Sequence, residues 1–314
     1  MERATKAQEL FREGYNCSQS VFAAYSDLYG IDQETALKLS ASFGGGLGRM
    51  REVCGAVSGM SMIAGLETGS AVKGDDAGKK YNYEVVQGLV QEFHKQNGSL
   101  ICRELLQLKE EEISSATPQS RTEEYYGTRP CEQLVRDAAG IIERVLYAMT
   151  LEMVSREEQI ETVARLAEEI WHEHYDSIIG KDQADYMIEH FQSCEAIRDQ
   201  ISQNGYEYRL MRSPGGYNGY LAYRMDPDSM FLSKLYIAKR FRGRGYARTA
   251  LDHLEEICRN NGVHRICLTV NRHNEGSIRA YEKLGFVRTG TQRADIGAGY
   301  VMDDFLMEKK VEPA

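Results

Sequence analysis

A glycine-rich loop between a strand pattern and a helix pattern constrains this chain more than any other feature. The apolar run at residues 231–237 predicts a strand, and Arg240-Phe241-Arg242-Gly243-Arg244-Gly245 follows it. Apolar residues then recur at helical spacing between positions 247 and 257. Glycines permit a tight turn, and the first amides of the helix then point at a bound anion with the helix dipole behind them. The order of strand, loop and helix therefore predicts a phosphate site with arginine charge beside it.

A second segment with a strand-then-helix pattern follows the loop and its helix. Residues 265–270 alternate as a strand does, Asn274 is placed to cap a helix running to about residue 283, and Gly285-Phe286 ends that helix. Asn274 and Tyr281 are seven positions apart, so they share one side of the helix. A glycine-rich turn also joins strands to helices that bind no ligand. The two segments together, in this order, indicate a binding domain.

Both segments resemble the motifs of the GNAT superfamily of N-acetyltransferases. The loop matches R-x-x-G-x-G, and residues 274–286 match N-x-x-S-x-x-x-Y-x-x-x-G-F. The resemblance implies an α/β domain with a mixed sheet over residues 148–314, with acetyl-CoA as its cofactor. It implies that strand backbone binds the pantetheine arm, that loop amides bind the pyrophosphate, and that Tyr281 is the catalytic residue that protonates the leaving CoA thiolate. The cofactor-binding residues that it implies are Leu235, Tyr236, Ile237, Arg240, Arg242, Gly243, Arg244, Gly245, Tyr246, Asn274 and Tyr281.

The residue that would accept the proton of an attacking amine is not evident from the sequence. The strand before the loop offers only Ser233 and Lys234. A water chain is one alternative, and the other candidates lie on the preceding helices: His172, Glu173 and His174. Asp303 and Asp304 come just before the last expected strand, at residues 305–308. They would either attract a cationic amine or form a solvated turn.

The first half of the chain shows helical periodicity almost throughout, which predicts an all-helical domain over residues 1–147. The polar segment 110–128 is expected to be a loop. Four cysteines of this half fall in or near the first turn of an expected helix: Cys17, Cys54, Cys102 and Cys131. The helix dipole favours a thiolate at such positions. Clustered thiols of this kind suit redox exchange or a soft metal, whereas buried packing between helices is the structural alternative.

The same half resembles the C-GCAxxG-C-C family, which is described as redox-active. The resemblance covers roughly residues 1–147 and depends on one cysteine pattern: Cys17, Cys54, Gly55, Ala56, Gly59, Cys102 and Cys131. The reaction of this family is poorly defined. A metal ion, an iron–sulfur cluster and a dithiol cycle therefore all stay open, and the identity of any metal is unknown.

Length and charge limit the remaining alternatives. The chain has 314 residues, enough for two domains, and its net charge of -9 does not suggest a basic surface for nucleic acid. No apolar run approaches the roughly 20 residues of a membrane span, and the first residues lack the apolar core of a signal peptide. We therefore expect a cytoplasmic protein whose cysteines are thiols, metal ligands or redox groups.

Two functional hypotheses follow. In the first, the protein is an N-acetyltransferase that moves an acetyl group from acetyl-CoA to a primary amine, with a small amine or polyamine favoured. In the second, it is a thiol or metal redox sensor whose GNAT-like domain mainly binds CoA. The expected partner is a small-molecule amine, with a redox partner and a homodimer as further candidates. Neither nucleic acid nor a membrane is expected to bind.

Overall fold

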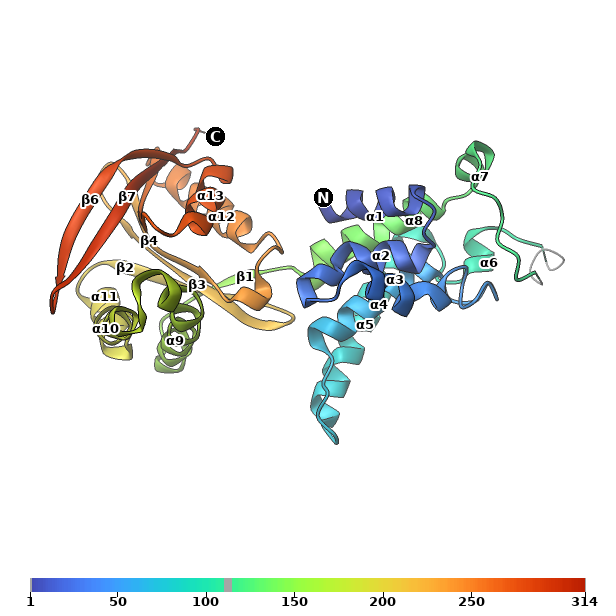
Figure 1. Ribbon diagram of the computed structural model, residues 1–314, viewed down its shortest axis with the longest axis horizontal. Helices are drawn as coiled ribbons and strands as arrows, with labels where there is room; N and C mark the ends of the chain where they lie inside the picture. The colour runs from blue at the N-terminus through green and yellow to red at the C-terminus, as the bar shows by residue number, and fades with distance from the viewer. Residues whose placement is uncertain (1, 110–114, 314) are drawn as a thin grey trace. The chain divides into compact units, whose positions relative to one another are not determined.

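The computed structural model describes residues 2–109 and 115–313, and the chain divides into two compact units. One comprises Met1–Ala148 with Ser213–Gly215, and the other comprises Met149–Arg212 with Gly216–Ala314. Figure 1 shows that the first is built from helices and the second from a sheet flanked by helices. These observations confirm the expected fold class. Within the described residues, no helix combines the length and the apolar character that crossing a membrane requires.

The helical unit consists of helices of different lengths, of which α5 is 22 residues long. Its α-helices are α1 (Glu2–Arg12), α2 (Cys17–Tyr25), α3 (Gln33–Ser40), α4 (Gly55–Thr68), α5 (Asp76–Asn97), α6 (Cys102–Leu105), α7 (Glu123–Thr128) and α8 (Cys131–Ile141). Shorter helical turns are η1 (Ser26–Tyr29), η2 (Ala41–Phe43) and η4 (Ile142–Leu146). The expectation of a continuous loop over residues 110–128 was wrong where α7 forms, and residues 110–114 lie outside the described residues.

Helix α2 is the centre of the helical unit, where it packs against α1, α4 and α8. Asn16 begins it, because its Oδ1 accepts hydrogen bonds from the amides of Ser18 and Gln19. The side chain of Gln19 in turn accepts a hydrogen bond from the amide of Asn16, which completes a capping box. Positions 20–25 are all buried. A helix that is buried on every side in this way lies inside the core rather than over it.

Two glycines of α4 allow it to approach α2 closely. A Cβ added to Gly59 would lie 2.8 Å from the carbonyl oxygen of Ser18, and one added to Gly55 would lie 3.2 Å from Cβ of Cys17. In contrast, a Cβ on Gly65 of the same helix would meet nothing within 4 Å. The glycines of the run C-G-A-x-x-G therefore serve helix packing, and they bring the start of α4 against the start of α2.

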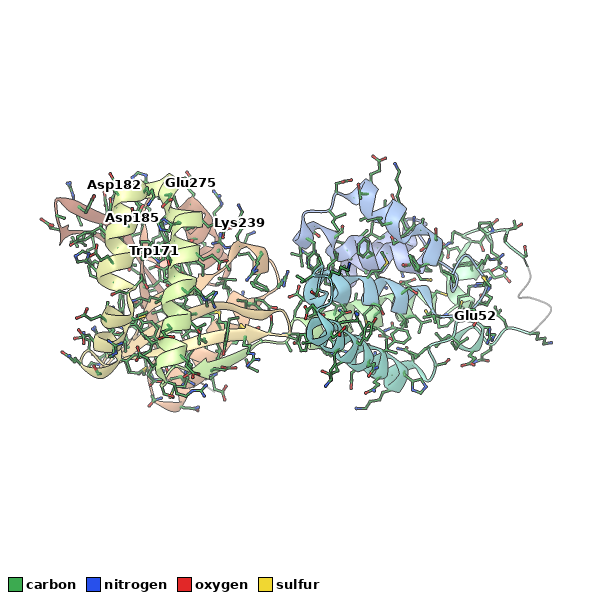
Figure 2. All side chains as sticks on the ribbon, turned by 90° about the horizontal axis from the view of Figure 1, so that it is seen from below. Glu52, Trp171, Asp182, Asp185, Lys239 and Glu275 are labelled. Atoms are coloured by element: carbon green, nitrogen blue, oxygen red, sulfur yellow. The ribbon has the colours of Figure 1, made fainter. Side chains whose placement is uncertain are left out.

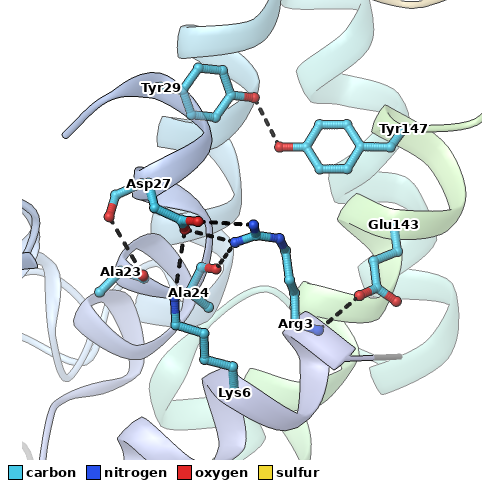
Figure 3. Close-up of polar contacts among 9 residues, drawn as sticks. Arg3, Lys6, Ala23, Ala24, Asp27, Tyr29, Glu143 and Tyr147 are labelled. Atoms are coloured by element: carbon cyan, nitrogen blue, oxygen red, sulfur yellow. Dashed lines mark hydrogen bonds and ion pairs between the residues drawn. The ribbon is translucent and has the colours of Figure 1, made fainter. Parts of the chain in front are cut away.

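Figure 3 shows an ion-pair network that begins on α1. Nη1 of Arg3 lies 2.7 Å from Oδ1 of Asp27 and donates a hydrogen bond of 2.6 Å to the carbonyl of Ala24. Nζ of Lys6 lies 3.6 Å from the same carboxylate, and the amide of Arg3 donates to Glu143 at 3.2 Å. The hydrogen bond from Arg3 holds the pKa of Asp27 below its usual range. Because Asp27 is exposed, the network fixes helix positions more than it adds stability.

The second unit is built on one seven-stranded sheet with the order β1-β2-β3-β4-β5-β7-β6. Its strands are β1 (Thr150–Met153), β2 (Tyr206–Ser213), β3 (Gly216–Met225), β4 (Met230–Ile237), β5 (Arg265–Asn271), β6 (Val287–Gly297) and β7 (Tyr300–Lys310). Strands β4 and β5 are parallel, whereas β5 and β6 each pair antiparallel with β7. The sheet is therefore mixed, as expected.

Helices cover both faces of this sheet. They are α9 (Glu157–Ile179), α10 (Lys181–Phe191), α11 (Cys194–Ser202), α12 (Tyr246–Asn260) and α13 (Glu275–Lys283), and η5 (Lys239–Phe241) precedes α12. Figure 1 shows α12 and α13 on one face and α9, α10 and α11 on the other. The face under α12 carries the main apolar core, formed by buried side chains of Leu221, Met230, Leu232, Leu251, Leu254, Ile266, Leu268 and Met307.

Candidate functional site

Strands β4 and β5 diverge in the middle of the sheet. They pair only at Met230↔Ile266 and Phe231↔Cys267, although β4 continues to Ile237 and stays paired with β3 along its length. Within the described residues, the edge of β4 at positions 235–237 therefore has no ladder partner on the β5 side. Such an edge can hydrogen-bond an extended ligand that carries amide groups.

The phosphate loop predicted from the sequence directly follows this edge. Gly243 (φ 78°) and Gly245 (φ 86°) both adopt left-handed backbone conformations, and Gly245 is the N-cap of α12. No side-chain hydrogen bond from this cap satisfies the first amides of the helix. Arg242 donates through Nε to the carbonyl of Ile237 at 2.9 Å, so its guanidinium group also fixes the loop against β4. The loop combines helix amides and positive charge at one place.

An aromatic cluster lies on the opposite face, where α9 packs on β3 and β4. The ring centroids of Trp171 and Tyr175 are 4.3 Å apart, and that of Tyr236 is 5.9 Å from Trp171. Figure 2 shows Trp171 on α9, over the sheet. The ring centroids of Tyr175 and Tyr236 are 6.3 Å apart, and burial raises the pKa of both phenols. Because its ring is committed to this cluster, Tyr236 is left to contact a ligand through its backbone.

Asn274 joins α13 to this cluster. Its side chain is 1% exposed, and its Oδ1 accepts a hydrogen bond from the amide of Ser277 at 3.2 Å. The same Oδ1 lies 3.1 Å from Nε2 of His174, and Nδ2 donates to the hydroxyl of Tyr175 at 3.4 Å. Burial, followed by the charge of Arg242, lowers the pKa of His174. The carboxamide of Asn274 is therefore held by protein groups from two helices.

Tyr281 lies in the last turn of α13, the helix that Asn274 caps. Its ring packs edge-on against Phe286 with centroids 5.5 Å apart, and it borders the apolar core. Burial, and then the neighbouring Tyr175, raises the pKa of its phenol. Tyr281 is therefore protonated at neutral pH.

Asp303 and Asp304 were expected just before a last strand at residues 305–308, and this boundary was wrong because β7 begins at Tyr300. Asp304 is therefore a strand residue and does not lie in a solvated turn. It lies within β7, opposite Asn271 of β5 and Gln292 of β6. The residue is 6% exposed, and within the described part of the chain its Oδ1 has no hydrogen-bond partner. Burial, and then the negative charge of Asp303, raises the pKa of Asp304 to about 6. A carboxyl group in this state can accept a proton near neutral pH.

Asp304 is electrostatically linked to the aromatic cluster, because its charge acts on the pKa of Tyr175. Asp303, on the other side of the strand, forms an ion pair of 2.7 Å with Arg272 and is partly exposed. The sequence signal that could have identified Asp304 is its place within the run Val301-Met302-Asp303-Asp304-Phe305-Leu306-Met307, where apolar residues on both sides predict a strand rather than a turn.

The other candidate proton acceptors have partners elsewhere. His172 bonds to Asp176 at 3.2 Å, and the carboxylate of Glu173 accepts a hydrogen bond from the amide of Lys239 at 3.2 Å. Lys234 is buried on β4 and donates to Gln200 at 2.7 Å, and burial lowers its pKa to about 8. Ser233 on the same strand is half-buried. These contacts make Asp304 the strongest candidate.

In the helical unit, the four family cysteines lie at the starts of four helices. Cys17, Cys102 and Cys131 are the first residues of α2, α6 and α8, and Cys54 is the N-cap of α4. Their thiols are free, and each acts on the pKa of others in the set. The structure therefore brings together residues that are up to 114 positions apart, as a shared role would require. We refer to this set as the cysteine cluster.

Arginine side chains surround the cysteine cluster. Nη1 of Arg51, a residue that is 4% exposed, lies 3.9 Å from Sγ of Cys102. A hydrogen bond with Cys17 lowers the pKa of Cys131 to about 7, against the effect of burial and with help from the charges of Arg129, Arg121 and Arg51. Among residues 2–109 and 115–313, no group of three or more His, Cys, Asp or Glu side chains is arranged to hold a metal ion.

Comparison with known proteins finds one family match in each half of the chain. Residues 15–145 match the family described as "Putative redox-active protein (C_GCAxxG_C_C)", and residues 165–286 match the Acetyltransferase (GNAT) family. An uncharacterized N-acetyltransferase of Bacillus subtilis, YdgE, is 33% identical over 92 residues, which cover 28% of this chain and 59% of that protein. The spermidine N(1)-acetyltransferase of Thermoplasma acidophilum is 24% identical over 159 residues, or 49% of this chain and 93% of that protein.

The match spans only part of the first curated relatives, between 48% and 64% of their length. Among solved structures, the PaiA N-acetyltransferase of Thermoplasma acidophilum in complex with coenzyme A has a TM-score of 0.45 and 22% identity, and covers 52% of this chain and 99% of that one. The ribosomal-protein-S18-alanine N-acetyltransferase of Escherichia coli has a TM-score of 0.39 and 17% identity, with coverage of 53% and 96%. The chain thus contains a C_GCAxxG_C_C domain followed by a GNAT acetyltransferase domain.

Proposed function

We propose that the GNAT domain transfers the acetyl group of acetyl-CoA to a primary amine. The observation that carries the proposal is the divergence of β4 and β5 directly before the Gly243–Gly245 loop. An extended pantetheine arm carries two amide groups and ends in a pyrophosphate, so it would lie along positions 235–237 and end at the start of α12. The predicted domain limits, 1–147 and 148–314, are part of this proposal.

The loop residues have separate roles in this account. The amides of Arg242, Gly243, Arg244, Gly245 and Tyr246 would bind the pyrophosphate, and the side chains of Arg240, Arg242 and Arg244 would add positive charge. Leu235, Tyr236 and Ile237 would offer backbone groups to the pantetheine. Asn274 would fix the start of α13 beside that arm, because its carboxamide is already bonded to Ser277 and Tyr175.

Two side chains would manage protons during the reaction. The amine attacks the thioester carbonyl, the resulting oxyanion collapses, and CoA leaves as a thiolate. Tyr281, which burial keeps protonated, would give that thiolate its proton. Asp304, which is buried and has an oxygen without a partner within the described residues, would accept a proton from the ammonium form of the acceptor, so that the neutral amine can attack. The two residues lie on α13 and β7, which both follow the diverging strands β4 and β5 in the chain.

The acceptor is proposed to be a small cationic amine, and a polyamine fits best. Asp304 places on β7 a carboxyl group whose Oδ1 has no partner within the described residues, and this group would attract a cationic amine. One relative is named a spermidine N(1)-acetyltransferase, and its similarity extends over 93% of its own length. Both points favour a cationic amine as the acceptor, and the name of this relative favours a polyamine among such substrates.

The test is a comparison of amines with the full chain and acetyl-CoA. Acetylated product, measured by chromatography with mass detection, should form from spermidine with a higher kcat/KM than from a monoamine of similar chain length. Equal kcat/KM values for the two would remove the polyamine assignment and leave the transfer reaction standing. Binding of acetyl-CoA with no acetylated product from any amine would contradict the proposed function itself.

A further inference from the structure

We propose that His174 is a positioning residue of the acetyl-CoA site, because it holds the start of α13 at the opening between β4 and β5 through a hydrogen bond from its Nε2 to Asn274. This role rests on the proposed course of the pantetheine arm along β4. His174 belongs to neither of the two motifs that the sequence shows. The place of its contact in the sheet, the neighbouring contacts of α9 and the atoms that take part each support the role.

The contact between His174 and Asn274 joins two helices that lie on opposite faces of the sheet. His174 is on α9, and Asn274 is the N-cap of α13 (Figure 1). Asn274 comes three positions after the last residue of β5, and the ladder between β5 and β4 ends at Cys267. Nε2 of His174 nevertheless lies 3.1 Å from Oδ1 of Asn274. The two helices therefore meet at the carboxyl end of β5, where the two strands have separated.

The residue that follows His174 connects the same asparagine to β4. Nδ2 of Asn274 donates a hydrogen bond of 3.4 Å to the hydroxyl of Tyr175. The ring centroids of Tyr175 and Tyr236 are 6.3 Å apart, and Tyr236 lies on the part of β4 that is proposed to bind the pantetheine arm. His174 and Tyr175 together therefore fix the distance between the start of α13 and this part of β4.

The residue that precedes His174 contacts the third part of the proposed site. The carboxylate of Glu173 accepts a hydrogen bond of 3.2 Å from the amide of Lys239, which directly precedes the phosphate loop. Three successive residues of α9 thus contact the segment before the loop, the start of α13 and the aromatic cluster on β4. Of these three contacts, the one made by His174 is the contact that places α13.

The partners of Asn274 determine which nitrogen of His174 carries a proton. The amide of Ser277 donates to Oδ1 of Asn274 at 3.2 Å, which identifies this atom as the carboxamide oxygen, and such an oxygen only accepts hydrogen bonds. Nε2 of His174 must therefore be the donor in their contact. Burial, followed by the charge of Arg242, lowers the pKa of His174, so its ring is neutral near pH 7 and Nδ1 carries no proton.

Calorimetric titration of the full chain with CoA tests this role. His174→Leu removes the donor and should raise the Kd for CoA by about fivefold, which corresponds to the loss of one hydrogen bond. His174→Gln places an N–H group near the position of Nε2 and should restore most of the affinity. His190→Leu is the control on α10, where His190 is exposed and its Nδ1 lies 2.9 Å from the carbonyl of Tyr186 in the same helix. It should leave the Kd unchanged.

The position of the proton is measured on the wild type. Nitrogen-15 NMR at about pH 8 should show a protonated Nε2 and an unprotonated Nδ1 in His174, with the signals assigned from their loss in His174→Gln. A proton on Nδ1 would overturn the hydrogen bond on which the role depends, and this measurement stays decisive if a variant fails to fold. Equal Kd values in His174→Leu and the wild type, or no recovery in His174→Gln, would overturn the positioning role alone. Absence of CoA binding in the wild type would overturn the proposed function, and this role with it.

Discussion

The side chain of Asn274 and the ring of His174 lie 3.1 Å apart, although they are 100 positions apart in the chain. The contact ties the start of α13 to α9. Oδ1 of Asn274 also accepts a hydrogen bond from the amide of Ser277. One oxygen therefore both caps α13 and joins α13 to α9. The residue expected from its motif to bind the cofactor is therefore also part of the framework of the domain.

Substitution of Asn274 should first affect stability. Asn274→Ala removes the N-cap of α13 and should lower the free energy of unfolding by about 1 kcal/mol. Asn274→Ser keeps a capping oxygen and should recover most of that loss. Urea denaturation of the two variants measures the difference. Equal stability of Asn274→Ala and the wild type would show that the cap contributes nothing.

The phosphate loop can be tested with a matched pair of glycines. Gly245→Ala places a side chain at a φ of 86°, which costs roughly 1–2 kcal/mol in the left-handed region. The strain acts on the start of α12, so the Kd for CoA should rise by about tenfold. Gly262→Ala carries similar strain at a φ of 68° after the end of α12 and should leave the Kd unchanged. Calorimetric titration with CoA compares the Kd values of the two variants. An equal rise in Kd in both would refute the assignment of the loop to phosphate binding.

Tyr281→Phe should separate chemistry from binding. Removal of the hydroxyl takes away the proposed proton donor, so kcat should fall by about 10²-fold while CoA affinity stays the same. Tyr206→Phe, on β2, is the control and should leave kcat intact. Steady-state rates with spermidine measure both. An unchanged kcat in Tyr281→Phe would assign this tyrosine a packing role alone.

The proposed role of Asp304 predicts that kcat/KM decreases on the acidic side of its pH profile, which is its acidic limb. Its pKa of about 6 means that the carboxyl becomes protonated as the pH falls through this value, and it can then no longer accept a proton. The kcat/KM of the wild type should therefore decrease below pH 6, and Asp304→Asn should lack this limb and be about 10²-fold slower. Asp303→Asn removes a negative neighbour and should move the limb to lower pH. Persistence of the limb in Asp304→Asn would contradict the assignment.

The same burial of Asp304 has a consequence for stability. Its folded-state pKa lies above the value of an unfolded chain, so the folded state retains the proton more strongly. Stability should then decrease as pH rises from about 4 to about 6, and the loss should persist above that window. Asp304→Asn should remove this dependence and raise Tm more at pH 8 than at pH 4. Thermal denaturation at both values provides the measurement.

Two glycines of α4 in the helical unit provide a matched pair of substitutions. Gly59→Ala would put a Cβ 2.8 Å from the carbonyl of Ser18, and such overpacking should cost about 1–3 kcal/mol of unfolding free energy. Gly65→Ala meets nothing within 4 Å and should stabilise the helix by about 0.5–1 kcal/mol. Denaturant titration of the helical unit's transition compares them. Stabilisation by both changes would rule out close packing of α4 on α2.

Local features of the sequence predicted much of this structure. The loop that ends at Gly245 and the cap at Asn274 depend on residues adjacent in the chain, so their backbone geometry follows from glycine and asparagine chemistry. The start of a helix near Cys17 was also predicted, and Asn16 caps that helix, α2. Each of these predictions required only the residues of one helix end or one turn, which are close together in the chain.

Features that depend on distant contacts were harder to predict. Asp304 is buried because β7 lies between β5 and β6, and neither pairing is visible from its immediate neighbours. Cys17 and Cys131 likewise begin helices α2 and α8, which come from opposite ends of the helical unit and pack against each other. Spacing placed both cysteines at helix starts, but the packing of α2 on α8 brought them together.

The central claim is acetyl transfer to an amine, and a labelled acetyl group tests it most directly. The full chain is incubated with spermidine and acetyl-CoA that carries carbon-13 in the acetyl carbonyl, and the label is followed by NMR. The account predicts that the signal moves from the thioester to an amide of spermidine, more slowly in Tyr281→Phe. Label that stays on CoA, or that appears as free acetate whether or not spermidine is present, would contradict it.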